Sequence, residues 1–93
     1  MKVEIYSKTA CPYCIRAKDY LRRNGIAYEE INYDDNTARQ EMYDKLGLVG
    51  TQRTVPQIFV VDGSSRERIG GYNDLVHSDL LSRREAGTFT AEF

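Results

Sequence analysis

Hydrophobic and polar positions alternate along the chain with two different periods, which predicts strands followed by helices. Val3–Tyr6 alternates at every second residue, the spacing of a short strand. Pro12 to about Asn24 follows a helical spacing, and Gly25 supplies a C-terminal stop. The apolar face of this predicted helix carries Cys14, Ala17 and Leu21.

A second strand and helix are predicted next. Ile26–Tyr33 has strand character, and the helix that follows stops at Gly47. Residues 34–37 offer several N-caps, and Thr37 with Gln40 has the spacing of a capping box. The buried stripe of this helix is expected to be Ala38, Met42 and Leu46.

The last third of the chain predicts a hairpin and a final helix. Gln57–Val61 is rich in β-branched and aromatic residues, and the Asp-Gly turn at Asp62–Ser65 leads into a fourth strand, Arg66–Ile69. Gly70-Gly71 breaks that strand, and Asn73 can cap a last helix. The inner side of this helix is expected to carry Val76 and Leu80.

The element order is therefore β-α-β-α-β-β-α. A β-α-β unit requires a parallel strand pair joined by a right-handed crossover, and the hairpin adds antiparallel strands. We expect an α/β fold with a mixed four-stranded sheet and helices on its faces.

Length and composition narrow the class of protein. The 93 residues predict one domain, 1–93, with 84–93 as a loose tail and a site at the surface rather than in a cavity. A net charge of -1 gives no basis for a nucleic-acid partner. No apolar run has membrane-spanning length, and the N-terminus lacks a signal-peptide core, so we expect a soluble cytoplasmic protein. We also expect it to be a monomer.

The chemistry is concentrated in Cys11-Pro12-Tyr13-Cys14, where a strand ends and a helix begins. A thiol there meets the free N–H groups and the positive end of the helix dipole, and both favour a thiolate. Pro12 suits the first helical position, because it has no N–H to leave unpaired. Cys14 lies one turn further on the inner face. Cys11 is therefore predicted to attack and Cys14 to resolve.

Other uses of the pair are disfavoured. A zinc site needs about four ligands, and His77 is the only further nitrogen ligand. A structural disulfide would close a very short loop and stabilise little. Lys8, three residues before Cys11, either stabilises the thiolate, holds a substrate carboxylate, or is a solvated lysine.

Two further segments stand out. Thr54-Val55-Pro56 sets a proline just before a strand, either as a trans residue at an edge or as a cis bond that exposes the Val55 backbone to an extended peptide. In Gly70–Asp74, Asn73 and Asp74 open a helix, which suits plain capping or a ligand that carries amino and carboxylate groups.

CPYC, TVP and GGYND together resemble the glutaredoxin family, over Val3 to about Leu81, and CPYC is similar to its dithiol branch. The resemblance implies a thioredoxin-like fold, a cis Val55-Pro56 bond and glutathione as co-substrate, with no metal. Tyr72 stands where many members have cysteine, and the loop Leu48–Gln52 is longer than usual.

The resemblance also implies a glutathione site. Lys8 would meet the glycine carboxylate, with Arg39 or Arg53 as a second cation, and Tyr13 would flank the sulfur. The cysteinyl backbone would be held at Thr54, Val55 and Pro56, and the γ-glutamyl end at Asn73 and Asp74.

The expected activity is reduction of glutathione mixed disulfides and protein disulfides, with ribonucleotide reductase as a candidate partner. Two alternatives remain at this stage. One is an electron donor to ribonucleotide reductase fed by thioredoxin reductase. The other is a dimer that binds an iron–sulfur cluster between Cys11 thiolates and glutathione.

Overall fold

Strand β1 (Lys2–Ser7) lies inside a four-stranded sheet in the computed structural model, which describes residues 2–80. The strand order is β2-β1-β3-β4, with β2 at Tyr28–Asn32, β3 at Gln57–Asp62 and β4 at Ser65–Gly70. β1 is parallel to β2 and antiparallel to β3, and β3 is antiparallel to β4. The predicted mixed sheet of a thioredoxin-like fold is confirmed.

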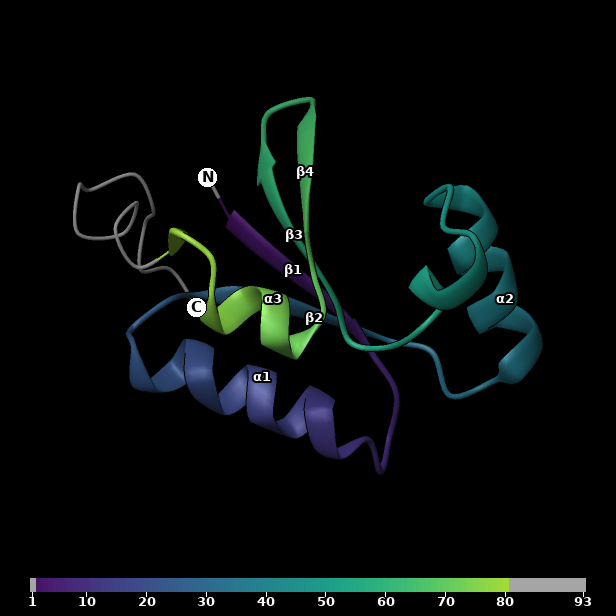
Figure 1. Cartoon of the computed structure of the whole chain (residues 1–93), viewed down its shortest axis with the longest axis horizontal. Helices are drawn as coiled ribbons and strands as arrows, with labels where there is room; N and C mark the ends of the chain where they lie inside the picture. The colour runs from purple at the N-terminus through teal and green to yellow at the C-terminus, as the bar shows by residue number, and fades with distance from the viewer. Residues whose placement is uncertain (1, 81–93) are drawn as a thin grey trace.

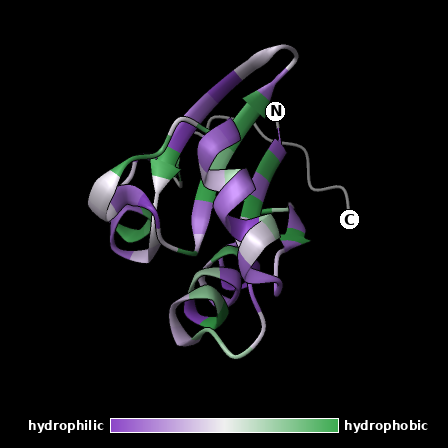
Figure 2. Ribbon diagram, turned by 90° about the vertical axis from the view of Figure 1, so that its right-hand side faces the viewer, coloured by the Kyte–Doolittle hydropathy of each residue, from purple (hydrophilic) through white to green (hydrophobic). Residues whose placement is uncertain are grey.

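Helices cover both faces of this sheet (Figure 1). α1 (Pro12–Arg23) and α3 (Tyr72–Val76) lie on one face, and α2 (Asn36–Lys45) lies on the other. Because β1 is covered on both sides, its polar residues Glu4 and Ser7, which point to opposite faces of the sheet, are buried as well. The hydrophobic β3 lies beside the hydrophilic β4 in the hairpin (Figure 2).

Each face has its own hydrophobic cluster. The cluster between the sheet and α1 and α3 consists of Val3, Ile5, Ala17, Leu21, Ile26, Ile58, Val60, Leu75 and Leu80. The cluster under α2 consists of Tyr6, Met42, Tyr43, Leu48 and Phe59. Burial of this apolar surface, at about 25 cal/mol per Å², holds the helices on the sheet.

The ends of α1 follow the sequence closely. Cys11 is the N-cap and Pro12 is the first helical residue. At the other end, the N–H of Gly25 donates to Arg22 O (3.1 Å) and that of Ile26 donates to Leu21 O (2.9 Å). This is the Schellman arrangement, which needs a left-handed residue, and Gly25 has φ +68°.

The predicted capping box of the second helix is wrong. α2 begins at Asn36, so the cap is Asp35, whose carboxylate accepts from Ala38 N at 2.8 Å. Thr37 then lies inside the first turn, where its hydroxyl cannot act as the N-cap. The expected stop at Gly47 is confirmed, since Gly47 has φ +71°.

Asn73 is also not a cap, contrary to the prediction. Gly70-Gly71 has already turned the chain, so α3 begins at Tyr72 with Gly71 as its N-cap. The Asp74 carboxylate reaches back and accepts from Gly71 N at 3.0 Å, which satisfies a free donor of the first turn.

Smaller differences concern boundaries and the buried stripes. The second strand is shorter than Ile26–Tyr33, because Ile26 and Ala27 are buried in the approach to β2 rather than paired in it. In α3 the buried position is Leu75, while Val76 is half-buried and Leu80 is buried beyond the helix. The tail predicted at 84–93 lies outside the described residues.

Within residues 2–80, none of the helices has the length and apolar character to cross a membrane.

Candidate active site

The sheet brings three separated segments to one edge. β1 leads into Cys11, β3 begins just after Pro56, and β4 ends at Gly70. Antiparallel pairing sets Tyr6 opposite Gln57 and Ile58 opposite Gly70, so the end of β1, the start of β3 and the end of β4 coincide. The CPYC, TVP and GGYND segments therefore meet at this edge.

Cys11 and Cys14 are joined by a disulfide, with their Cα atoms 5.2 Å apart. The N–H of Cys14 donates to Cys11 Sγ at 3.2 Å, so a backbone donor of the first helical turn points at this sulfur. A donor in this position stabilises a thiolate after the disulfide is reduced. In the disulfide form Cys11 is 5% exposed and Cys14 is 1% exposed, so the difference in access is small.

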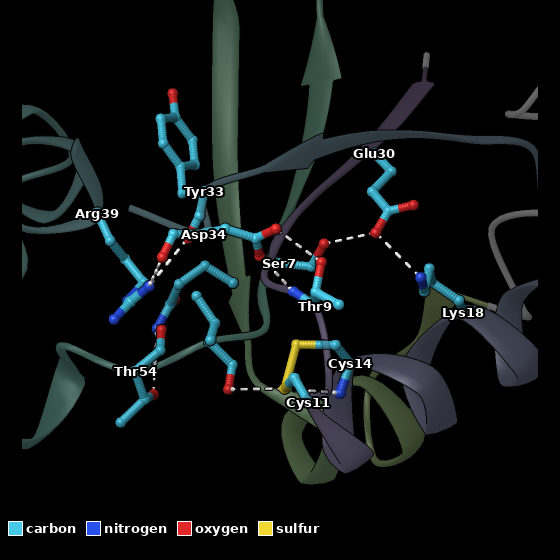
Figure 3. The surroundings of a disulfide bond; sticks show 12 residues. Ser7, Thr9, Cys11, Cys14, Lys18, Glu30, Tyr33, Asp34, Arg39 and Thr54 are labelled. Atoms are coloured by element: carbon cyan, nitrogen blue, oxygen red, sulfur yellow. Dashed lines mark hydrogen bonds and ion pairs between the residues drawn. A yellow bond between two sulfur atoms is a disulfide. The ribbon is translucent and has the colours of Figure 1, made fainter. Parts of the chain in front are cut away.

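The loop between β1 and Cys11 is fixed by a carboxylate from another segment (Figure 3). Asp34 accepts from Thr9 N at 2.6 Å and from Thr9 Oγ1 at 2.7 Å. The backbone hydrogen bond from Thr9 is the main reason why the pKa of Asp34 lies below its ordinary value. Ala10, next to Cys11, has φ +58°, a left-handed conformation that costs an ordinary residue about 1 kcal/mol or more.

Lys8 and Arg39 also lie near Asp34. The positive charges of both side chains contribute to lowering the pKa of the Asp34 carboxyl, after the hydrogen bonds from Thr9. Arg39 already donates to Tyr33 O (2.9 Å), Asp34 O (3.2 Å) and the side-chain oxygen of Asn36 (3.1 Å). Of the two arginines considered for a carboxylate, Arg39 is therefore the one near Lys8.

Arg53 serves a different purpose. Its guanidinium pairs with Asp44 at 2.9 Å and donates to the carbonyls of Leu48 and Gln40. It also lies over the Tyr43 ring, 5.3 Å from its centre. These contacts fasten the loop before Pro56 to α2, so Arg53 acts as a structural brace.

The Val55-Pro56 peptide bond is cis, as the resemblance implied. Cys11 Sγ lies 3.8 Å from the Val55 carbonyl oxygen, so this loop is directly against the reactive pair. The buried amide of Gln57 donates to Gln52 O and Thr54 O, both at 2.8 Å, and accepts from Arg68 Nε at 3.1 Å. Gln57 thus holds the loop in place from below.

A groove of about 300 Å³ runs beside this loop. We call it the active-site groove; its lining residues are Tyr13, Thr54, Val55, Pro56, Gly71, Tyr72, Asn73 and Asp74. Lys8 is not among them. The alternative cations Arg39 and Arg53 do not line it either. The remaining residues that the sequence assigned to a ligand site all line this one groove: Tyr13, Thr54, Val55, Pro56, Asn73 and Asp74.

Packing explains the glycine at the far end of the groove. Gly70 has φ +117°, which side chains rarely adopt. A Cβ atom at Gly70 would also collide with the Asp74 carboxylate. Gly70 therefore lets the chain turn while Asp74 stays close to the Gly71 backbone.

Comparison with known proteins agrees with this geometry. A family model described as glutaredoxin matches residues 3–65. Glutaredoxin 3 of Escherichia coli (strain K12) is 44% identical over 78 residues, which are 83% of this chain and 84% of that protein. The chain belongs to the glutaredoxin family.

Solved glutaredoxin structures share the fold. Glutaredoxin 1 from Francisella tularensis, complexed with cacodylate, has a TM-score of 0.71 at 34% identity, covering 94% of this chain and 95% of that one. The buckwheat glutaredoxin–glutathione complex has a TM-score of 0.61 at 28% identity, covering 91% of this chain and 69% of that one. Family membership together with the C-x-x-C pair identifies this glutaredoxin as a thiol–disulfide oxidoreductase.

Sequence reasoning missed the residues that support this glutaredoxin site from outside its motifs. Asp34 and Gln57 hold the two loops that flank Cys11. On the other side, the buried Ser7 hydroxyl donates to Glu30 at 2.5 Å, and Lys18 of α1 pairs with the same carboxylate at 3.0 Å (Figure 3). The hydrogen bond from Ser7 is the main reason why the pKa of Glu30 is lowered.

No local pattern in the sequence marks Asp34, Gln57 or Glu30 as residues that support the site. Each acts on a segment that is remote in sequence or on a backbone group. The useful signal for Asp34 and Gln57 is a polar residue at the end of a predicted strand, whereas Glu30 lies inside a predicted strand and carries no such signal. Within residues 2–80, no three His, Cys, Asp or Glu side chains are grouped so that they could hold a metal ion.

Proposed function

We propose that this glutaredoxin reduces glutathione mixed disulfides and protein disulfides, with glutathione as the electron donor. The observation that carries the proposal is the junction of the Cys11–Cys14 pair with the active-site groove across the Val55-Pro56 loop. The groove brings together backbone groups for a peptide and a carboxylate for an ammonium group. Glutathione is a tripeptide thiol that carries both a peptide backbone and an ammonium group, so it fits this set of groups.

In the proposed first step, the Cys11 thiolate attacks the glutathione sulfur of a mixed disulfide. A Cys11–glutathione disulfide forms as the substrate–glutathione bond breaks, and the substrate leaves as a thiolate that takes a proton from water. A second glutathione thiolate attacks the bound glutathione sulfur. This releases oxidised glutathione and restores the Cys11 thiolate.

The contacts we assign to glutathione follow its chemistry. Lys8, with Arg39 nearby, faces the glycine carboxylate, and Asp74 beside Asn73 faces the γ-glutamyl ammonium. The backbone of Val55, next to Thr54, pairs with the cysteinyl residue as a strand would. The Tyr13 ring flanks the sulfur. The buckwheat glutaredoxin that shares this fold is described as a glutathione complex, which supports the assignment.

For a protein disulfide, Cys14 completes the reaction. Cys11 first forms a mixed disulfide with one substrate sulfur and releases the other as a thiolate. The Cys14 thiolate then attacks Cys11 Sγ, expels the second substrate sulfur and leaves the Cys11–Cys14 disulfide. Two glutathione molecules reduce that disulfide. The 5.2 Å separation of the two Cα atoms suits such a bond.

Substitution of each cysteine by serine tests these roles. Cys11→Ser is expected to lower turnover of a glutathione mixed disulfide by about a hundredfold or more, because the nucleophile is lost. Cys14→Ser is expected to keep that turnover within about threefold but to lose reduction of protein disulfides. The measurement is glutathione oxidation coupled to glutathione reductase, with both substrates.

The opposite pattern, in which Cys14→Ser loses the mixed disulfide reaction and Cys11→Ser keeps it, would reverse the assigned roles. Turnover that depends on thioredoxin reductase and not on glutathione would favour a dedicated redoxin instead.

The cytoplasm, where glutathione is abundant and reduced, is the compartment that we assign to this reaction.

A further inference from the structure

A second groove lies beside the active-site groove, along the outer side of α1. Its volume is about 320 Å³. We call it the α1 groove; its lining residues are Arg16, Asp19, Tyr20, Arg23, Asn24 and Tyr72. Tyr72 lines both grooves, so they meet at this side chain. The Tyr13 and Tyr72 rings, 6.2 Å apart, form the boundary.

The α1 groove carries two positive charges on one helix face. Arg16 and Arg23 are seven residues apart, which is nearly two full helical turns, so both side chains point the same way. Both are exposed. Within residues 2–80, neither guanidinium forms a hydrogen bond or an ion pair, and the contact of Arg16 is with the Tyr13 ring, 5.3 Å from its centre.

The carboxylate of Asp19, which lines the α1 groove, does not offset these charges. Asp19 is paired with Arg22, the neighbouring arginine on the same helix. Within the described part of the chain, two unpaired guanidinium groups therefore remain beside the rings of Tyr20 and Tyr72. Such a surface favours carboxylates, because guanidinium groups bind them with two parallel hydrogen bonds and carry a permanent charge.

We propose that the α1 groove binds an acidic segment of the protein substrate, next to the cysteine that carries the disulfide. This inference rests on the proposed function. When the glutathione half of a mixed disulfide fills the active-site groove, the polypeptide half must lie elsewhere. The α1 groove adjoins the active-site groove at Tyr72, and its positive charge favours an acidic occupant.

The spacing of the arginines sets the spacing of the acidic residues. Arg16 is five residues from Cys11 and Arg23 is twelve, so they lie about 8 Å and about 18 Å along the helix axis. An extended peptide advances about 3.3 Å per residue. Acidic residues are therefore expected about two or three and about five or six positions from the substrate cysteine.

Glutathionylated peptides that differ only in charge test the proposal. Each has one cysteine, with glutamate, glutamine or lysine at positions two, three, five and six on one side of it. At low ionic strength, the kcat/KM of the wild-type protein should be about two- to fivefold higher for glutamate than for glutamine peptides, and lower again for lysine. The preference should shrink in 0.5 M salt.

Charge reversal locates the effect. Arg23→Glu should lower the ratio of kcat/KM for glutamate over lysine peptides, with a gain for the lysine peptide. Lys45→Glu, an exposed position in the last turn of α2 on the other side of the sheet, makes the same change in net charge and should leave the ratio unchanged. An equal effect of both variants would overturn the proposal.

Equal kcat/KM for all three peptides with the wild-type protein would also overturn it. The mixed disulfide of cysteine and glutathione separates this inference from the proposed function: its turnover by wild type tests the function alone.

Discussion

Asp34 shows how a single residue holds the segment before Cys11 from a position that is distant in sequence. Its two carboxylate oxygens hold the backbone and the hydroxyl of Thr9, two residues before Cys11. The sequence revealed Cys11, Pro12 and Cys14, because strand end, N-cap, proline and spacing are local features. It did not reveal Asp34, because the partner is 25 residues away and only the folded sheet brings the two together.

Replacement of Asp34 by asparagine is predicted to destabilise the protein in a pH-dependent manner. The pKa of Asp34 lies below its ordinary value of 3.8 in the folded state, so its charged form is bound more strongly there. Its stabilisation is complete above the unfolded pKa and is lost as pH falls through the folded pKa. The measurement is the midpoint of urea unfolding of wild type and Asp34→Asn from pH 7 to pH 3.

The difference in unfolding midpoint should be complete at pH 7 and should shrink as the pH falls below the ordinary pKa of 3.8 toward pH 3. Glu41→Gln, an exposed position on α2, is the control and should match wild type at both ends. An Asp34→Asn defect of the same size at pH 3 and pH 7 would show that the carboxylate charge is not responsible.

At the scale of elements, both long helices end in the same way and begin in different ways. The N–H groups of Gly47 and Leu48 donate to Asp44 O and Tyr43 O, which repeats the arrangement at Gly25 in α1. Glycine stops are readable from sequence, since left-handed backbone favours glycine. The start of α2 is less readable, because several residues in 34–37 have capping side chains and packing decides which one is used.

The N-cap of α2 can be tested directly. Asp35→Ala is predicted to lower the free energy of unfolding by about 1 kcal/mol, because the donor of Ala38 loses its partner. Thr37→Ala is the matched control and should change it by less than about 0.5 kcal/mol. Both are measured by urea denaturation at pH 7. A larger loss for Thr37→Ala would restore the capping box that the sequence suggested.

Arg53 illustrates a limit of sequence reasoning for elements. The sequence offered it as a cation for a carboxylate, but its guanidinium is used by Asp44 and by the carbonyls of Gln40 and Leu48. Those partners come from α2 and from the turn after it. Nothing in the sequence around Arg53 indicates that α2 lies beside it.

At the scale of the whole molecule, the sequence predicted the element order and the mixed sheet, because periodicity and turn residues are strong signals in this chain. The strand order β2-β1-β3-β4 was not predicted, because the parallel unit and the hairpin leave open which of their strands pair with each other. The same topology explains why three separate motifs form one site, since their strands end or begin at one edge of the sheet. The cis bond before Pro56 came from family resemblance and not from local chemistry.

Two apolar clusters stabilise the molecule, and the site lies at the edge between them. α1 is held by the cluster around Leu21 and Ile5, and the Val55 side of the loop packs with the cluster around Phe59. The cysteine pair and the Val55-Pro56 loop are thus anchored to opposite faces of one sheet. This arrangement fixes the distance between the cysteine pair and the active-site groove without an enclosed cavity.

The pH dependence of alkylation of Cys11 in the fully reduced protein tests the central claim most directly. The rate of reaction with iodoacetamide, with the modified cysteine located by mass spectrometry, reports the thiolate fraction at each pH. We predict that Cys11 reacts first and that its midpoint lies one pH unit or more below about 8.5, the value of a free cysteine. A midpoint near 8.5, or earlier modification of Cys14, would contradict the account.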